Sequence, residues 1–264
     1  MIRMAIAGAA GRMGRAIIRE IGCLDDMMLV AALVSERSGL AGSDAGEMAG
    51  VRALSVPVSS GGIECAFDTM VDFSRPDALR DNLEICKRHD AGIVVGTTGL
   101  DESQNRCMAE AAKQIPVLYA ANTSIGINLC VSLVEMAARV LDGSDVEIVE
   151  AHHGGKVDAP SGTAILLGEA AAVARNQDLA ACGVFSREGH TGRRRAGSIG
   201  FSTIRGGDIA GEHTVLFIGE SERIEITHRT TDRKIFARGA LQAARWLSGQ
   251  ERGLYSMADA LNLD

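Results

Sequence analysis

Short apolar runs alternate with helical patterns over the first 120 residues, and this alternation limits the fold more than any other feature. The apolar runs are residues 2–7, 28–34, 69–73, 92–95 and 116–120. Helical patterns occupy residues 14–21, the stretch from 75 to 86 and a stretch ending at 113. Strands that are apolar throughout are buried on both faces, and the helices between them cover a parallel sheet. The sequence therefore predicts an α/β domain with a doubly wound parallel sheet.

The pattern changes near residue 124, where a second domain is predicted to begin. Residues 126–141 form one long helical pattern whose apolar stripe comprises Leu129, Leu133, Met136, Val140 and Leu141. A strand at 146–150, a helix at 164–175 and three alternating runs at 198–204, 213–218 and 223–228 follow. Successive strands without helices between them favour a mixed or antiparallel sheet in an α+β domain. A last helix, 235–247, is predicted to pack back on the first domain.

Composition excludes several classes of protein. The 34 acidic residues outnumber the 27 basic ones, and the net charge of −7 repels phosphate backbones, so no nucleic-acid partner is expected. No stretch reaches the roughly 20 apolar residues of a membrane helix, so we expect no membrane partner and a cytoplasmic location. The six cysteines are scattered without a C-x-x-C pair, which predicts reduced thiols and no metal site.

Two turns that contain glycine directly follow predicted strands. The first, residues 8–14 (G-A-A-G-R-M-G), lies between a strand and a helix, where glycines let a pyrophosphate approach backbone N–H groups. The second, residues 96–99 (G-T-T-G), follows a later strand at the same edge of the sheet. An ordinary glycine-rich turn is the alternative in both places. The position between strand and helix favours dinucleotide binding.

The densest polar segment is residues 150–164, E-A-H-H-G-G-K-V-D-A-P-S-G-T-A. Its Lys156 is one of only four lysines among 27 basic residues. His152 and His153 are adjacent on a strand and point to opposite faces, so proton transfer with Lys156 suits them better than a shared metal. Residues 161–163 precede a helix whose free N–H groups favour a carboxylate. The alternative is a surface loop with a plain helix cap.

Residues 150–164 resemble the signature of the dihydrodipicolinate reductase family, whose members reduce 4-hydroxy-tetrahydrodipicolinate in the diaminopimelate route to lysine. Further matching segments follow in order: residues 8–14, 42–46, 72–76, 96–99, 120–122, 187–192, 199–201, 205–209, 211–214 and 246–249. The resemblance implies a Rossmann-like dinucleotide-binding domain at 1–123 and 233–264. It also implies a substrate-binding domain at 124–232 that builds a homotetramer.

The resemblance implies roles for individual residues as well. His152 is expected to donate and accept a proton, and Lys156 to donate one. The dicarboxylate substrate is expected at His153, Gly162 and Thr163, and the helix start adds Ser161. NADPH or NADH is expected at Gly8, Ala9, Ala10, Gly11, Arg12, Met13, Arg75, Gly96, Thr97, Thr98, Ala120, Ala121, Asn122 and Thr123.

The end of the second predicted strand bears on the choice of cofactor. An acidic residue there normally binds the ribose 2′-hydroxyl and repels a 2′-phosphate. This chain has Val34 and Ser35, where some family members have Glu-Arg. Ser35, Arg37 and Arg12 can contact a phosphate, whereas Glu36 could restore a preference for NADH. The sequence predicts that both cofactors are used and that NADPH is modestly favoured.

Other departures and alternatives remain open at this stage. Gly154 and Gly155 replace side chains beside the site, and Thr123 stands where members often have Phe. One alternative is a different two-domain NAD(P)-dependent oxidoreductase, and another is a non-catalytic nucleotide-sensing protein of the same fold. The His-His-x-x-Lys pattern counts against both. Three successive arginines at 193–195 could steer an anionic substrate or form a solvated turn or a subunit contact.

Overall fold

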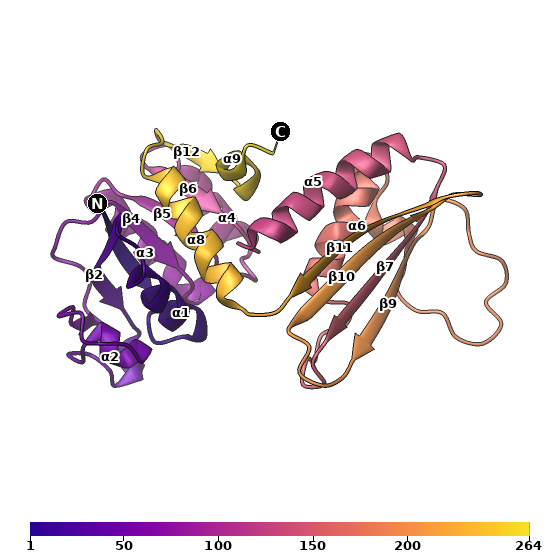
Figure 1. Cartoon of the computed structure of the whole chain (residues 1–264). Helices are drawn as coiled ribbons and strands as arrows, with labels where there is room; N and C mark the ends of the chain where they lie inside the picture. The colour runs from indigo at the N-terminus through magenta and orange to yellow at the C-terminus, as the bar shows by residue number, and fades with distance from the viewer. Residues whose placement is uncertain (264) are drawn as a thin grey trace. The chain divides into compact units, whose positions relative to one another are not determined.

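The computed structural model describes residues 1–263, and the chain forms two units (Figure 1). The first comprises Met1–Ile125 and Lys234–Asn262, and the second comprises Gly126–Arg233. The chain therefore enters the second unit once, leaves it once, and completes the first unit with its C-terminal segment. The sequence predicted the corresponding boundaries at 123/124 and 232/233.

The first unit is built on a seven-stranded sheet in the order β12-β6-β5-β4-β1-β2-β3, with every neighbouring pair parallel. The strands are β1 (Ile2–Ala7), β2 (Met27–Leu33), β3 (Val58–Ser59), β4 (Thr69–Asp72), β5 (Gly92–Val95), β6 (Pro116–Tyr119) and β12 (Gly253–Tyr255). The chain runs outward from β1 to β3 and then returns to β4 on the other side of β1. This reversal is the strand order of the Rossmann fold, so the predicted doubly wound domain is confirmed.

Helices cover both faces of this sheet. They are α1 (Arg12–Ile21), α2 (Ala45–Ala49), α3 (Leu79–Arg88), α4 (Glu102–Ala111), α8 (Lys234–Leu247) and α9 (Met257–Leu261), with 3-10 turns at Glu36–Ser38 and Pro76–Ala78. α1 and α8 lie side by side on the face that includes Met4 and Ile6, whereas α3 and α4 pack on the face that includes Ala5 and Ala7. Most residues of these strands are apolar, with exceptions such as Arg3 and Asp72, because both faces of the sheet are covered. No helix in the described part of the chain is long and apolar enough to cross a bilayer.

The second unit has a five-stranded mixed sheet in the order β11-β10-β7-β9-β8. Its strands are β7 (Asp145–His152), β8 (Gly183–Val184), β9 (Ile199–Arg205), β10 (Gly211–Ile218) and β11 (Arg223–Thr230), and its helices are α5 (Ile125–Val140), α6 (Gly162–Ala174) and α7 (Leu179–Cys182). The central β7 is parallel to β9 and antiparallel to β10, which confirms the predicted mixed sheet. α5 and α6 cover one face, where Val134 and Leu167 join Ile148 and Phe217 in the core.

The buried side of α5 is not the predicted apolar stripe. The stripe residues Leu129, Leu133, Met136 and Val140 are exposed, and Val140 is 75% exposed. The helix buries Ile127, Val134 and Ala138 instead. Both sides of α5 are apolar, so the periodicity alone could not identify the side that faces the sheet.

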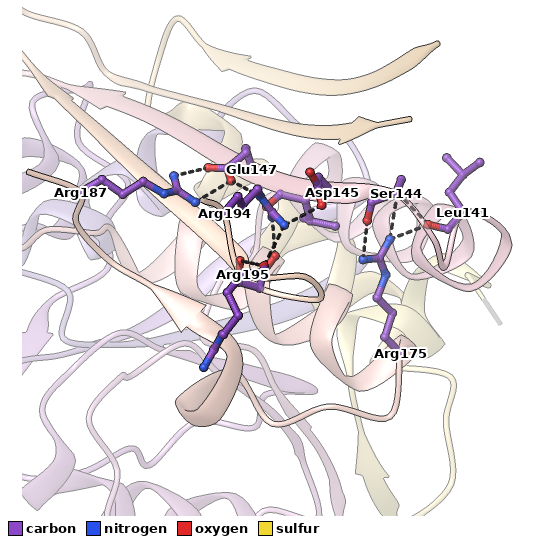
Figure 2. A network of polar contacts seen from close by, with 10 residues as sticks. Leu141, Ser144, Asp145, Glu147, Arg175, Arg187, Arg194 and Arg195 are labelled. Atoms are coloured by element: carbon purple, nitrogen blue, oxygen red, sulfur yellow. Dashed lines mark hydrogen bonds and ion pairs between the residues drawn. The ribbon is translucent and has the colours of Figure 1, made fainter. Parts of the chain in front are cut away.

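An arginine network fastens loops of the second unit to the start of β7 (Figure 2). Arg194 donates to Asp145 at 2.6 Å and to Glu147 at 3.1 Å, while Arg187 forms two bonds of 2.8 Å with Glu147. Arg175, just after α6, donates to the carbonyl oxygens of residues 141 and 144. Burial would raise the pKa of Glu147, but the two guanidinium groups hold that pKa below its ordinary value. Of the three successive arginines, Arg194 therefore stabilises the fold.

Candidate active site

The carboxyl ends of five parallel strands bring the predicted cofactor residues to one edge of the first sheet. Gly8 follows β1, Ser35 lies two residues after β2, and Arg75 lies three residues after β4. Gly96 directly follows β5, and Ala120 directly follows β6. Ligands of open α/β sheets bind at this edge, beside the reversal of strand order. Residues that are far apart in the sequence are therefore collected where a dinucleotide binds.

The glycine turn after β1 has no room for a side chain at Gly8 or at Gly14. Gly8 has a φ of +73°, and a Cβ there would lie 2.5 Å from the carbonyl oxygen of Phe73. A Cβ at Gly14 would lie 2.3 Å from the Gly8 carbonyl oxygen. Gly11 caps α1 without a side-chain hydrogen bond, so the N–H groups of the first helical turn are left for a ligand. The turn fits the pyrophosphate of a dinucleotide.

A buried carboxylate supports the neighbouring turns. Asp72, the last residue of β4, accepts hydrogen bonds from the Asn82 side chain at 2.9 Å and the Ser74 N–H at 2.8 Å. It also accepts one from the Thr97 hydroxyl at 3.3 Å, so Thr97 faces the interior while Thr98 beside it is exposed. Asp72 therefore joins the turns after β4 and β5, a role that the sequence analysis did not assign to it.

The predicted cofactor residues differ in exposure. Gly11, Arg12, Ser35, Arg37, Arg75, Thr98 and Ala121 are exposed, whereas Ala9, Gly96, Thr97, Ala120 and Thr123 are buried; Gly8, Ala10, Met13 and Asn122 are intermediate. Ser35 accepts a hydrogen bond from the Arg37 N–H at 3.2 Å and so begins a 3-10 turn. Thr123 donates its hydroxyl to the Phe236 carbonyl at 2.8 Å, which holds its side chain inside the first unit.

The second unit places a buried ion pair beside His152 at the end of β7. Glu150 is 1% exposed, and its Oε2 lies 2.6 Å from Nδ1 of His152. Arg205, the last residue of β9, donates to both Glu150 oxygens at 2.7 and 2.8 Å. The N–H of Ser161 donates to Oε1 of Glu150 at 3.1 Å. One carboxylate therefore connects β7, β9 and the start of α6.

These contacts set the charge states of both partners. Burial alone would raise the pKa of Glu150, but the bonds from Arg205 and His152 hold it below its ordinary value. Burial lowers the pKa of His152 and outweighs the opposing effect of Glu150, while Lys156 and Arg205 lower it further. At neutral pH the site therefore holds an ionised Glu150 beside a neutral imidazole.

The other predicted substrate residues gather around this pair. Lys156 lies in the loop after β7, and its Nζ donates to both oxygens of Asp158 at 2.7 and 2.8 Å. Nε2 of His153 lies 3.2 Å from Nη2 of Arg233. Gly162 is exposed at the start of α6. His153, Arg233 and Lys156 therefore supply positive or titratable groups, and the N-terminus of α6 at Gly162 also favours anions.

The predicted substrate residue Ser161 has its hydroxyl in the interior of the second unit. It is 2% exposed and caps α6 by accepting a hydrogen bond from the Ala164 N–H at 3.2 Å. The same oxygen lies 2.9 Å from Nε2 of His213. His213 is 5% exposed, and its burial lowers its pKa to about 4. Ser161 therefore holds the start of α6 in place through buried contacts, while Gly162 beside it is exposed.

Sequence analysis missed four members of the site: Glu150, Arg205, His213 and Arg233. A signal existed for Glu150, because residues two apart on a strand share a face and Glu150 precedes His152 by two. Arg205 and His213 depend on strand register, which pairs His152 with Arg205 and Glu150 with His213, whereas Arg233 lies outside the strands, just before α8. In residues 1–263 no group of three or more His, Cys, Asp or Glu side chains is arranged to hold a metal ion.

A Rossmann-type unit with a glycine turn, joined to a second unit in which His152 and Lys156 lie near each other, is the arrangement of a two-domain NAD(P)H-dependent oxidoreductase. Residues 2–123 match the family described as "Dihydrodipicolinate reductase, N-terminus", and residues 126–261 match "Dihydrodipicolinate reductase, C-terminus". The chain belongs to the dihydrodipicolinate reductase family. Its cofactor is a nicotinamide dinucleotide, and it catalyses the family's reduction step in the diaminopimelate route to lysine, as the sequence predicted.

Solved structures agree with this assignment. A dipicolinate-bound dihydrodipicolinate reductase from Paenisporosarcina sp. TG-14 has a TM-score of 0.77 and 25% sequence identity, and 98% of each chain is covered. A probable dehydrogenase from Thermotoga maritima has a TM-score of 0.60 at 13% identity, covering 99% of this chain and 93% of that one. An amine dehydrogenase from Mycobacterium smegmatis has a TM-score of 0.56 at 13% identity, covering 97% and 95%. The last two show a shared fold alone.

Proposed function

We propose that the second unit holds the dicarboxylate substrate at the start of α6 and that Lys156 and His152 move its protons. The observation that carries this proposal is the set of bonds around Glu150 and Arg205. Glu150 binds His152 and the Ser161 N–H, while Arg205 also donates to the Asp158 carbonyl at 2.7 Å. The strand end, the Lys156 loop and the helix start are therefore held together in one site.

The substrate carboxylates have suitable partners in this site. The N–H groups at Gly162 and Thr163 lie in the first turn of α6, where the helix dipole favours negative charge. His153 and Arg233 add a second group of donors beside it. The relative from Paenisporosarcina is described as dipicolinate-bound, which supports a planar dicarboxylate as the ligand here.

The reaction adds one hydride and one proton to the substrate and releases one water. A nicotinamide dinucleotide held by the glycine turn of the first unit supplies the hydride. Loss of the 4-hydroxyl group with a proton from the adjacent ring carbon releases the water and leaves a cyclic unsaturated imine. Hydride addition to this imine gives an enamine, which must then be protonated on carbon. Lys156 donates this proton from an ammonium group that Asp158 holds at 2.7 Å. His152, neutral at neutral pH, accepts and returns a proton beside it.

We also propose that the chain uses both NADPH and NADH, with a modest preference for NADPH. Ser35 is exposed just beyond β2, where Rossmann folds contact the ribose 2′ substituent. Arg37 and Arg12 are exposed as well, and guanidinium groups pair well with phosphate. Glu36 opposes them with a carboxylate, so the preference is small.

A homotetramer is the assembly we propose for the chain. Ile204 and Ile218 are exposed on the face of the second sheet that α5 and α6 do not cover. Apolar side chains exposed on a sheet face are typical of subunit contacts. Light scattering should give four times the chain mass of 27.7 kDa. A monomer mass at working concentrations would contradict this assembly.

The substrate site can be tested with a planar dicarboxylate. Nicotinamide oxidation is followed with the freshly made product of the preceding synthase as substrate, in the presence of pyridine-2,6-dicarboxylate. The inhibitor should compete with the substrate and not with the nucleotide, because its carboxylates take the same N–H groups. Competition with the nucleotide alone would show that the dicarboxylate site lies elsewhere.

A further inference from the structure

We propose that Glu150, clamped by Arg205, is a positioning residue that fixes His152 in the tautomer with its proton on Nδ1. The Nε2 atom of His152 is then the one that exchanges protons with the substrate. This inference rests on the proposed role of His152 and deepens it. It depends on the hydrogen bonds that converge on the Glu150 carboxylate.

The partners of Glu150 determine the direction of its bond with His152. Oε1 receives hydrogen bonds from Arg205 Nη2 at 2.7 Å and from the Ser161 N–H at 3.1 Å. Oε2 receives one from Arg205 Nη1 at 2.8 Å and lies 2.6 Å from Nδ1 of His152. An ionised carboxylate can only accept hydrogen bonds, so Nδ1 must carry the proton. In a neutral imidazole, Nε2 is then an unprotonated base.

Arg205 holds this carboxylate in place through bonds that do not involve His152. Its Nη1 donates to the Ile204 carbonyl at 2.7 Å, and its Nη2 donates to the Asp158 carbonyl at 2.7 Å. The guanidinium is therefore anchored to β9 and to the Lys156 loop as well as to Glu150. A carboxylate held by two charge-assisted bonds cannot rotate freely, so the imidazole bonded to it is held in one orientation.

The opposite side of the imidazole lies beside Gly211, and 11% of the His152 side chain remains exposed. A Cβ at Gly211 would lie 3.0 Å from Nε2 of His152, so the glycine keeps this side free of a side chain. Within residues 1–263 the structure gives Nε2 no hydrogen-bond acceptor or donor. The charged and titratable groups around the ring are Glu150, Arg205, Lys156 with Asp158, and His213 with its cross-strand neighbour His228.

The Glu150→Gln variant is expected to reverse the tautomer. An amide nitrogen at the Oε1 position would face two donors, whereas at the Oε2 position it would face only one, Arg205 Nη1. The amide therefore turns its NH2 toward His152, and Nδ1 becomes the acceptor. Two-bond 1H–15N spectra of histidine-labelled protein report which ring nitrogen is protonated, and His152→Gln identifies the His152 signals.

Glu147→Gln is a matched control. Glu147 lies on the same strand, β7, and also pairs with two arginines, but it contacts no histidine. We expect Glu150→Gln to lower kcat at least about 10-fold and to move the acid limb of its pH profile to lower pH, because the anion that favours imidazolium is lost. Glu147→Gln should leave the tautomer and the pH profile unchanged.

The outcomes separate this inference from the proposed function. A protonated Nε2 in the wild-type spectrum overturns the inference, and that measurement needs no variant to fold. An unchanged tautomer and pH profile in Glu150→Gln, or equal effects in Glu147→Gln, also overturn it. If His152→Gln retains normal kcat, the catalytic role of His152 fails, while the wild-type and Glu150→Gln spectra still decide whether Glu150 sets the tautomer.

Discussion

The two proposed ligand-binding regions of this chain use different parts of the polypeptide, the backbone in one and side chains in the other. At the edge of the first sheet, the backbone makes the site: Gly8 and Gly14 leave no space for a Cβ, and the first turn of α1 offers N–H groups. At the end of β7, side chains make the site: Glu150, Arg205 and His152 are joined by hydrogen bonds of 2.6 to 2.8 Å. Substitutions in the first region should therefore lower dinucleotide affinity, whereas substitutions in the second should lower kcat.

The largest effect is expected at Lys156. Lys156→Ala should lower kcat by about 100-fold or more, because the proton donor is lost, and leave dinucleotide affinity nearly unchanged. Steady-state rates and direct titration of the dinucleotide measure the two quantities. Lys113→Ala, which removes another lysine paired with a carboxylate at 2.7 Å, should change neither. Near-normal turnover of Lys156→Ala would show that the second region does not supply this proton.

Acid should weaken the second region through His213. Burial lowers the pKa of His213 to about 4 from an ordinary 6.5, so between these values the unfolded chain binds more protons than the folded one. The free energy of unfolding therefore falls as the pH falls, by about 2 kcal/mol between pH 7 and pH 5 for this group. Denaturant titrations over this range should show a shallower pH dependence in His213→Gln.

The exposed His190 provides the control for this measurement. His190→Gln should keep the wild-type pH dependence, because its side chain lies in an exposed loop. If His213→Gln retains the full slope, then His213 is not the group that makes the second region sensitive to acid.

The backbone of the first region should respond to a single methyl group. Gly8→Ala combines a φ of +73° with a Cβ 2.5 Å from the Phe73 carbonyl oxygen, so the turn must move. We expect dinucleotide affinity to fall by about 10-fold or more, since the N–H groups no longer meet the pyrophosphate. Gly50→Ala has a φ of +81° but no atom within 4 Å of its Cβ, and it should leave affinity unchanged. If both variants lose the same dinucleotide affinity, the effect comes from reduced stability and not from the fit of the turn.

The smallest expected effect concerns the choice of dinucleotide. The ratio of kcat/KM for NADPH to that for NADH should exceed one by only a few-fold, and Ser35→Glu should lower it by repelling a 2′-phosphate. Ser38→Glu places the same charge three residues later in the exposed 3-10 turn and serves as the control. A strong wild-type preference for NADH that Ser35→Glu does not alter would show that the 2′ substituent does not meet this turn.

The first region could be predicted from the sequence because its signals are local. Each buried strand is one apolar run, and the glycine turn is seven consecutive residues between a strand and a helix. The short β3 and β12 and the small helices α2, α7 and α9 were not predicted, since two to five residues carry too little pattern. The apolar stripe predicted for α5 is exposed for another reason. A helix that is apolar on both sides has no periodicity that identifies its buried face.

The second region was predicted only where its residues are consecutive. His152, His153 and Lys156 stand within five positions, so their chemistry could be inferred from residue types alone. Arg205 lies 55 residues from Glu150, His213 lies 52 from Ser161, and Arg233 lies 80 from His153. Arg205 and His213 meet their partners through strand register, and Arg233 meets His153 from outside the strands, so no local pattern encodes these contacts. The contact between Ser161 and His213 was missed for the same reason.

The bond between Thr123 and Phe236 has a consequence for how the chain can be rearranged. Thr123 donates to the Phe236 carbonyl at 2.8 Å, and Gly239 packs directly against the Thr123 backbone. The point where the first unit is interrupted and the point where it resumes are therefore neighbours. The second unit is an insertion whose two ends meet, and domains are readily inserted or removed at such junctions. A short loop that replaces residues 126–233 would make the nucleotide-binding half one continuous polypeptide.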